Sequence, residues 1–170
     1  MSISELLAIY PYSWSSIGTA VFCGGLIGLE RQLRGKPVGM RTAALIILGT
    51  YLFLATSFML QGQIVDPSRI IGQVVTGIGF LGAGVMLARD GRVAGVTSAA
   101  CIWVLASIGV VIATDHLEQA IKLSVLVVCI LYGLDFLEDR FKILGRGVHA
   151  RVHLSFQRSR SKAERPNGES

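Results

Sequence analysis

Glu30 and Arg31 are the residues of this chain best placed to do chemistry within an otherwise apolar segment. They end the run GGLIGLER, in which Glu30 is the only acid. An ionisable side chain at membrane depth is costly and is a functional candidate by default. Glu30 has two candidate partners. Arg34, four residues on, would fix a helix end, whereas Arg41, which opens the next apolar segment, would join two helices.

Polar side chains in two other apolar segments are further candidates. Gln73 and Thr76 lie one helical turn apart, so their side chains could meet, and Thr97 and Ser98 begin a later segment. Either pair would hydrogen-bond between helices or line a small polar cavity. Trp103 lies near the middle of its segment, away from the interface, and we expect it to pack inside. The functional candidates are Glu30, Arg31, Arg41, Thr42, Gln73, Thr76, Thr97, Ser98 and Trp103.

The run GIGFLGAG at residues 77–84 contains a literal G-x-G-x-x-G, which is the fingerprint of a dinucleotide-binding loop. That fingerprint requires a strand before it, a helix opening within it and an acid about 20 residues later. Here it lies inside the uncharged run 70–88, and the position that requires the acid falls at Ile102. The chain has 20 glycines, so a match of three is weak evidence. The sequence therefore disfavours a dinucleotide-dependent enzyme.

No arrangement typical of a catalytic or metal site is found in the sequence. It has no Ser/His/Asp or Cys/His set, no Cys-x-x-Cys and no Cys/His cluster. Cys23, Cys101 and Cys129 all lie in apolar segments, where we interpret them as small helix residues. We expect no enzymatic activity, no catalytic residues, no cofactor and no bound metal.

The composition predicts an integral membrane protein. Of the 170 residues 52% are hydrophobic and 16% are charged, whereas soluble domains carry about 25% charged residues. A membrane-spanning helix needs about 20 apolar residues. Five segments reach or approach that length, at residues 14–29, 42–60, 70–88, 93–113 and 120–136. The expected fold class is all-α, a polytopic membrane bundle of about five transmembrane helices.

The distribution of Lys and Arg predicts the orientation of this bundle. Fourteen of the 16 lie in the first loop, the third loop and the C-terminal tail, which share one side of a five-helix bundle. No Lys or Arg precedes Arg31, so the N-terminus lacks the positive region of a cleaved signal peptide. We expect residues 1–13 outside, 14–137 as the transmembrane domain and 138–170 as a basic cytoplasmic tail. The net charge of +5 reflects this topology and does not call for nucleic acid as a partner.

Local signals predict two helix starts and the character of the tail. Asp66 before Pro67 predicts an N-cap for the third segment, and Asp115 with Glu118 predicts a capping box for the fifth. Residues 148–156 alternate apolar and polar side chains, which indicates a β-strand with one apolar face. The last 14 residues are polar, and we expect them to be disordered.

Small residues recur at helical spacing. Helices in a bilayer gain little from hydrophobic association, so close packing through small residues matters more. Gly24 and Gly28 are four residues apart, as are Gly95 and Ala99. The third segment has small residues on more than one face, which suits a central position. We expect helix packing at Gly24, Gly28, Gly72, Gly77, Gly79, Gly82, Gly84, Gly95 and Ala99.

Taken together, these segments resemble the MgtC/SapB family of bacterial inner-membrane proteins. The resemblance lies in GGLIGLER at 24–31, GMRTAALIILGTYLF at 39–53, RIIGQVVTGIGFLGAGVML at 69–87 and VAGVTSAACIW at 93–103. It covers residues 18–136 in the family's order and spacing. The positions that match family motifs are Glu30, Arg31, Gly39, Arg41, Thr42, Gly77, Gly79, Phe80, Gly82, Gly84, Thr97, Ala99, Ala100 and Trp103.

The resemblance implies a multi-pass inner-membrane protein linked to growth at low magnesium and to bacterial survival and virulence inside macrophages. It implies a regulator that acts on other membrane proteins, such as the ATP synthase or a transport ATPase. Small-residue helix faces would supply surfaces for homo- or hetero-association in the lipid bilayer. The alternative is a small transporter or channel for Mg²⁺ or another ion. The scarcity of acids disfavours it, because Mg²⁺ usually binds one or two carboxylates.

Two features depart from the family pattern. Many members continue into a cytoplasmic domain with an ACT-like fold, whereas this chain stops after what resembles the first strand of that domain. We therefore expect a short form that lacks most of it. The fourth segment reads GVTSAA where GLTTAA is commoner, which is a mild change.

Overall fold

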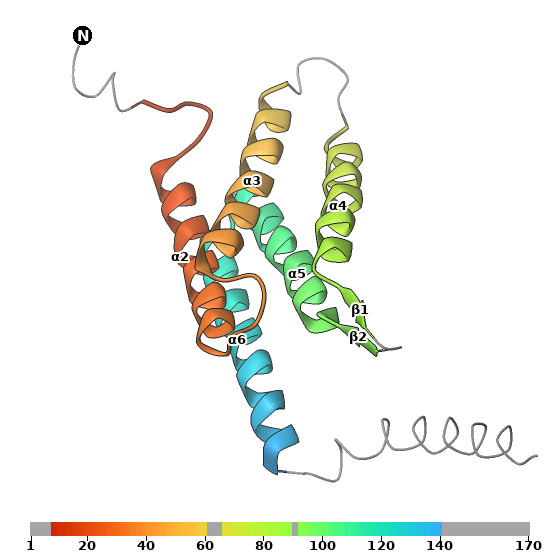
Figure 1. The fold of residues 1–170 in the computed structure, drawn as a ribbon. Helices are drawn as coiled ribbons and strands as arrows, with labels where there is room; N and C mark the ends of the chain where they lie inside the picture. The colour runs from red at the N-terminus through yellow and green to blue at the C-terminus, as the bar shows by residue number, and fades with distance from the viewer. Residues whose placement is uncertain (1–7, 61–65, 90–91, 141–170) are drawn as a thin grey trace, which may run out of the picture. The chain divides into compact units, whose positions relative to one another are not determined.

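The computed structural model describes residues 8–60, 66–89 and 92–140, which form five helices and one short hairpin (Figure 1). In chain order the elements are α2 (Trp14–Leu33), α3 (Met40–Met59), α4 (Pro67–Gly84), β1 (Leu87–Arg89), β2 (Arg92–Ala94), α5 (Val96–Ala113) and α6 (Leu117–Arg140). Each of the five apolar segments overlaps one of these helices. The prediction of a helical fold is confirmed, and the hairpin is an addition to it.

The chain divides into two units, residues 1–129 and 130–170. The first unit holds α2 to α5, the hairpin and the first part of α6. Of the second unit, the structure describes residues 130–140, which are the end of α6. The predicted strand at 148–156 and the predicted disordered end lie outside the described residues.

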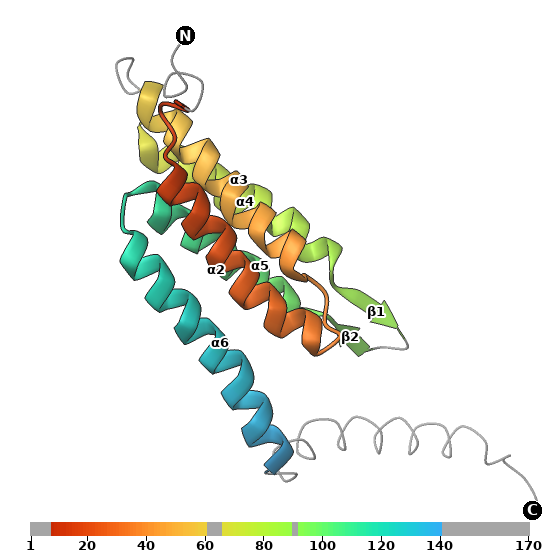
Figure 2. The same ribbon diagram turned by 90° about the vertical axis from the view of Figure 1, so that its left-hand side faces the viewer.

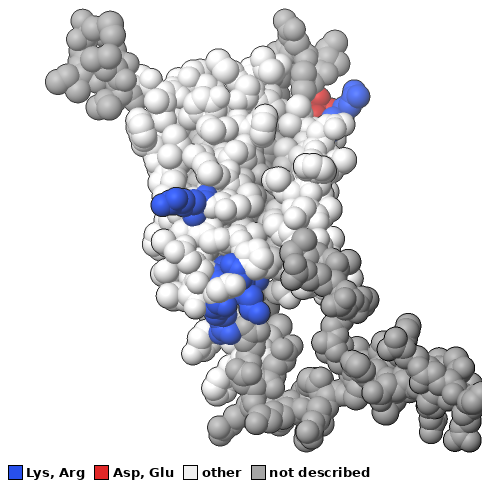
Figure 3. All heavy atoms as spheres, in the orientation of Figure 1, with Lys and Arg blue, Asp and Glu red and all other residues white. Residues whose placement is uncertain are grey.

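Three of the described helices are long and apolar enough to cross a membrane, namely α3, α5 and residues Leu117–Leu134 of α6. α2 and α4 do not reach this hydropathy, since α2 ends in charged residues and α4 contains Arg69, Gln73 and several glycines. Much of the described surface seen in Figure 3 carries no Lys, Arg, Asp or Glu. The chain is a membrane protein by these features, and membrane crossing by α2 and α4 stays a prediction.

Within the first unit, α2, α3, α4 and α5 lie side by side and alternate in direction (Figures 1 and 2). The end of α2, the start of α3, the hairpin and the start of α5 therefore meet at one end, which we call the hairpin end. α3 packs against α2, α4 and α5, so the expectation that the glycine-rich α4 is central in this unit is wrong. The largest fully buried apolar side chains are Ile27, Ile47, Leu54, Ile102, Leu105, Ile108 and Ile112.

Glycines set the closest helix approaches. A Cβ at Gly28 would lie 2.5 Å from Met40 Cα, and one at Gly24 would overlap the backbone of Ala44, so both glycines admit the α3 backbone to the surface of α2. A Cβ at Gly109 of α5 would lie 2.6 Å from Thr50 Cβ, a close approach that the sequence did not predict.

The other small residues predicted to pack have different surroundings. At Gly82 a Cβ would lie 3.7 Å from Ala99 Cβ, which is ordinary contact between α4 and α5. The α4 glycines with open space within 4 Å among the described residues are Gly72, Gly77, Gly79 and Gly84. A packing role for these four stays a prediction.

The start of α4 agrees with its prediction from the sequence, and its end does not. At its start the prediction is confirmed: the Asp66 carboxylate accepts a hydrogen bond from the Ser68 backbone N–H at 2.9 Å, with Pro67 next to the cap. At its end the helix stops at Gly84, short of the predicted limit at residue 88. Residues Leu87–Arg89 instead form β1, which pairs antiparallel with Arg92–Ala94 of β2. An apolar run has the same hydropathy in a helix and in a strand, so hydropathy alone predicted a helix that was too long.

Gly95 connects the hairpin to α5 and does not lie in the helix, contrary to the packing stripe predicted with Ala99. It is the N-cap of α5, with a left-handed φ of 90°. A Cβ there would overlap the carbonyl oxygen of Val85. Glycine is required at this position both by its φ and by the close approach of the backbone after α4.

The start of α6 also differs from its prediction. The helix begins at Leu117, and the Ala120 N–H donates to the carbonyl oxygen of His116. Asp115 has a left-handed φ of 63° and precedes the capping position by one residue. The predicted capping box is therefore not formed, because Asp115 belongs to the turn.

Candidate functional site

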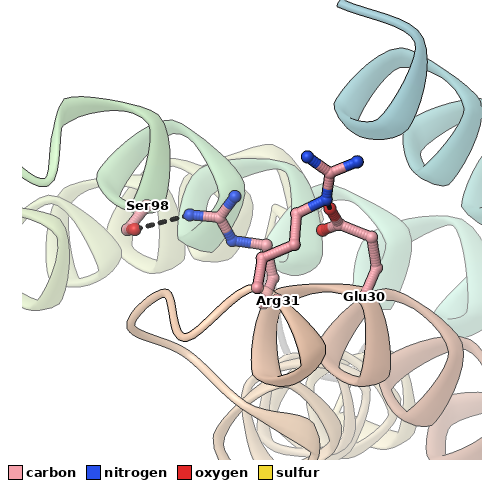
Figure 4. Close-up of polar contacts among 4 residues, drawn as sticks. Glu30, Arg31 and Ser98 are labelled. Carbon is pink, nitrogen blue, oxygen red and sulfur yellow. Dashed lines mark hydrogen bonds and ion pairs between the residues drawn. The ribbon is translucent and has the colours of Figure 1, made fainter. Parts of the chain in front are cut away.

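Arg31 and Ser98 meet at the hairpin end of the first unit. Arg31 lies in the last turn of α2 and Ser98 in the first turn of α5. The Arg31 Nη2 donates a hydrogen bond to Ser98 Oγ at 2.8 Å, and Figure 4 shows the guanidinium reaching from α2 to α5. Both residues are buried, with 3% and 2% of their surfaces exposed. The bond thus ties together two helices whose contacting residues lie 67 positions apart.

Glu30 lies beside Arg31 and is also buried, at 8% exposed. The Arg34 Nε lies 2.6 Å from Glu30 Oε1, which is an ion pair between residues four apart on α2. That contact lacks hydrogen-bond geometry, and neither carboxylate oxygen accepts a hydrogen bond from the described residues. The Arg31 Nε also lacks an acceptor among them. Of the two partners that the sequence left open for Glu30, the structure has Arg34 and not Arg41.

We call Glu30, Arg31, Arg34 and Ser98 the Glu30 cluster. It holds two arginines and one glutamate, so an excess of positive charge lies at a largely buried position. The Arg34 guanidinium pairs with Glu30, and that of Arg31 points to Ser98. Each buried charge costs several kcal/mol of desolvation unless it is paired and hydrogen-bonded. The cluster therefore suits a hydrogen-bond acceptor or an anion better than a metal cation.

The predicted candidates on α3 and α4 lie apart from the Glu30 cluster. Arg41 is exposed at the start of α3 and forms no ion pair within the described part of the chain. Thr42 and Gln73 both line a cavity of about 710 Å³ between α3 and α4. The Thr76 hydroxyl donates to the carbonyl oxygen of Gly72 at 2.9 Å. Its hydrogen bond is thus made within its own helix, and Gln73 faces the cavity.

The remaining candidates lie on α5, and one prediction about them is wrong. Ser98 forms the interhelical hydrogen bond expected of the Thr97–Ser98 pair, whereas Thr97 is exposed. Trp103 is 54% exposed, although we expected it to pack inside. α5 is apolar all round, so its sequence does not distinguish the buried face, which carries Ile102 and Leu105, from the outward one.

A second polar network, which was not predicted from the sequence, lies at the opposite end of the first unit. The hydroxyl groups of Tyr12 and Thr56 lie 2.9 Å apart, and the Ser13 backbone N–H donates to the Tyr51 hydroxyl at 3.0 Å. The Ser13 side chain also caps α2 by accepting from the Ser16 N–H. Serine directly before an apolar helix was the available signal for this cap. Together these bonds fasten the start of α2 to α3.

The described residues can also be examined for metal ligands, which for magnesium are oxygen atoms. Among the residues that the structure describes, no three His, Cys, Asp or Glu side chains gather in one place. Glu30 is the buried acid in this part of the chain, and two arginines already flank it in sequence or space.

The chain is similar to known proteins over most of its length. The profile of the MgtC family matches residues 17–140, which include α3 to α6 and all of α2 except its first three residues. This chain belongs to the MgtC family. The predicted resemblance is therefore confirmed, and the Glu30 cluster lies within the matched region of this MgtC-family protein.

Curated relatives of this MgtC-family chain carry two kinds of name. The "Putative magnesium transporter YhiD" of Escherichia coli K12 is 42% identical over 142 residues, 79% of this chain and 65% of that protein. "Protein MgtC" of Salmonella typhimurium LT2 is 35% identical over 127 residues, 75% of this chain and 54% of that protein. "Protein MgtC" of Brucella abortus is 36% identical over 111 residues, which are 65% of this chain and 46% of that protein. The chain thus spans about half to two thirds of these relatives, and no solved structure matches it.

Proposed function

We propose that this chain is a non-catalytic modulator in the bacterial inner membrane, which acts on other membrane proteins when magnesium is scarce. Support for the link to magnesium comes from family membership and from a relative whose name includes magnesium. The same family link extends the proposal to survival inside macrophages and to virulence. The ATP synthase or a transport ATPase is the proposed partner, and homo-oligomers are proposed as a second form of association.

The observation that carries this proposal is the state of Glu30. Glu30 is the buried acid of the described chain, and it is already in an ion pair with Arg34 and beside the buried Arg31. A Mg²⁺ pathway would need carboxylates free to replace water ligands of the ion. At this position two guanidinium groups would repel the cation. The cluster is better suited to holding α2 and α5 in one arrangement than to passing ions.

The proposed topology has five spans, with the N-terminus outside and the C-terminus in the cytoplasm. In this arrangement α2 and α4 also cross the membrane, beside the three helices that are apolar enough by themselves. Charged and polar residues in transmembrane helices are tolerated when they face a bundle interior. Burial of Glu30 and Arg31 supports this arrangement for α2.

Site-specific photo-crosslinking in living cells tests the modulator proposal. The chain, with a photoreactive residue at Gly79 on the open face of α4, would be expressed at low magnesium in bacteria lacking their own MgtC-family protein. We expect a crosslink to one other inner-membrane protein, identified by mass spectrometry, that weakens when magnesium is restored. The same residue at Gly25 of α2, where a Cβ also meets open space, is the matched control. Recovery of self-crosslinks alone would refute the hetero-association part of the proposal.

The second candidate function is transport of Mg²⁺ or another ion. The printed name of the E. coli relative favours it, and so does the cavity between α3 and α4, which Thr42 and Gln73 line with polar groups. Hydroxyl and amide oxygens are acceptable ligands for a hard cation, but usually together with carboxylates. Flux measurements on the reconstituted protein separate the two functions.

A further inference from the structure

The cavity between α3 and α4 is not used by the modulator proposal. Its volume is about 710 Å³, which lies within the range of about 300–1,000 Å³ for ligand sites. Most of its lining is apolar, including Leu45 and Phe53 of α3 and Ile78 and Leu81 of α4. We call it the α3–α4 groove.

The length of the groove matches one leaflet of a bilayer. Along α3 it runs from Thr42 to Phe53, a distance of about 17 Å at the rise of an α-helix. Half of a hydrocarbon core is about 15 Å thick. The Thr42 end lies two residues from the start of α3, so the groove begins close to the hairpin end and reaches toward the middle of the membrane.

Small residues leave the groove open along its lining. α3 and α4 contact each other within the first unit, and the groove lies between them. Gly49 and Gly77 have open space where a Cβ would lie, so no side chain from these positions fills the hollow. An extended hydrocarbon chain can lie there against the apolar side chains of both helices.

Positive charge lies at the mouth of the groove. Arg41 precedes Leu45 by four residues, so both lie on the same face of α3, and Arg41 is exposed without an ion pair among the described residues. Arg34 and Lys36 also lie at the hairpin end. Clusters of Lys and Arg next to membrane helices attract anionic lipid head groups.

We infer that the α3–α4 groove binds one anionic phospholipid, with an acyl chain along the groove and the phosphate at Arg41. The charge at the mouth favours this lipid over a neutral one and over an apolar helix of a second copy. The inference is independent of the modulator proposal, because a bound lipid is compatible with either candidate function.

Native mass spectrometry of the full chain, purified in detergent and titrated with phosphatidylglycerol or phosphatidylcholine, tests this inference. We expect the wild type to retain one phosphatidylglycerol and to bind phosphatidylcholine about fivefold more weakly, the effect of roughly one basic residue. Gly77→Leu fills the groove and should weaken retention at least tenfold. Gly79→Leu, which also adds its side chain to open space but outside the groove, should bind like the wild type.

Charge variants test the proposed position of the head group. Arg41→Gln should weaken phosphatidylglycerol about fivefold and remove its advantage over phosphatidylcholine, whereas Arg69→Gln at the other end of α4 should change neither. If Gly77→Leu does not fold, Gly49→Leu replaces it, because Gly49 lines the same groove from α3. Unchanged lipid retention in the groove variant would overturn the inference. So would loss of an oligomer in that variant with lipid binding intact, since a second copy would then occupy the groove.

Discussion

At the scale of single residues, the cluster of Glu30, Arg31, Arg34 and Ser98 is the most unusual feature of the described chain. Buried arginine and glutamate are seldom tolerated unless their charges are paired and their hydrogen bonds are made. Here the pairing is partial, because one ion pair and one interhelical bond leave Glu30 Oε2 and Arg31 Nε unused. The cluster therefore depends strongly on each contact that it does make.

Ser98→Ala tests that dependence. It removes the acceptor of the Arg31 Nη2 and leaves a buried charged donor unpaired, so the free energy of unfolding should fall by about 1–3 kcal/mol. The matched control is Ser107→Ala on the same helix, where the hydroxyl is exposed and donates only to the carbonyl oxygen of Val104. Thermal unfolding of both variants in the same detergent provides the comparison. Equal melting temperatures for the two variants would contradict the role assigned to Ser98.

Sequence reasoning found the members of the cluster but only part of its geometry. The spacing of four residues between Glu30 and Arg34 made their ion pair foreseeable, since such residues face each other on a helix. The bond from Arg31 to Ser98 was not foreseeable, because it depends on how the ends of α2 and α5 meet across 67 positions.

At the scale of elements, glycines decide how closely helices approach. Gly28→Val would place a side chain against the backbone of Met40, so α2 and α3 would have to separate. We expect a loss of about 1–3 kcal/mol from such overpacking, measured as a lower melting temperature and a lower folded yield. In Gly25→Val on the same helix, the new side chain meets open space, so the melting temperature and the folded yield should stay near those of the wild type. A Gly28→Val protein as stable as Gly25→Val would show that the close approach is not needed.

The N-terminus of α4 should respond to pH. The Ser68 hydroxyl and backbone N–H, as donors, hold the pKa of the Asp66 carboxyl below its ordinary value. The ionised Asp66 carboxylate therefore stabilises the helix fully above the ordinary pKa, about 4. This stabilisation is lost as the pH falls through the lowered pKa. Asp66→Asn keeps a capping acceptor without this titration.

Hydrogen exchange of the first-turn amides of α4 measures the effect. At each pH the protection in the wild type is divided by that in Asp66→Asn, which cancels the intrinsic pH dependence of exchange. We expect a ratio above one at neutral pH that falls toward one or below in acid. A ratio that stays constant across this range would contradict a role for the charged cap.

Hydropathy predicted where the helices lie, but not where each of them ends or which of their faces is buried. Apolar runs of helical length predicted the existence of α2 to α6, and Asp66 correctly predicted the start of α4. The hairpin was missed because residues 85–88 are apolar in either conformation. A signal was present: Asp90-Gly91 separates the two strands in sequence, and this dipeptide is typical of two-residue hairpin turns. The exposure of Trp103 had no such signal, since α5 is apolar on every face.

At the scale of the whole molecule, the proposed orientation rests on the basic first and third loops and tail. A fluorescent protein fused after residue 170 should fluoresce, since it folds in the cytoplasm, and alkaline phosphatase at the same position should stay inactive. Active phosphatase with a dark fluorescent protein would reverse the orientation.

In the function that we propose, this MgtC-family chain influences other membrane proteins and does not itself carry Mg²⁺. Influx of Mg²⁺ into liposomes with a trapped indicator, containing the purified chain or its Glu30→Ala variant, tests this proposal. A known magnesium channel reconstituted in the same way is the positive control, and both proteins are first shown to be folded and inserted. We expect influx equal to that of protein-free liposomes. Faster influx with the wild type that disappears in Glu30→Ala would contradict it and make Glu30 a residue of the ion pathway.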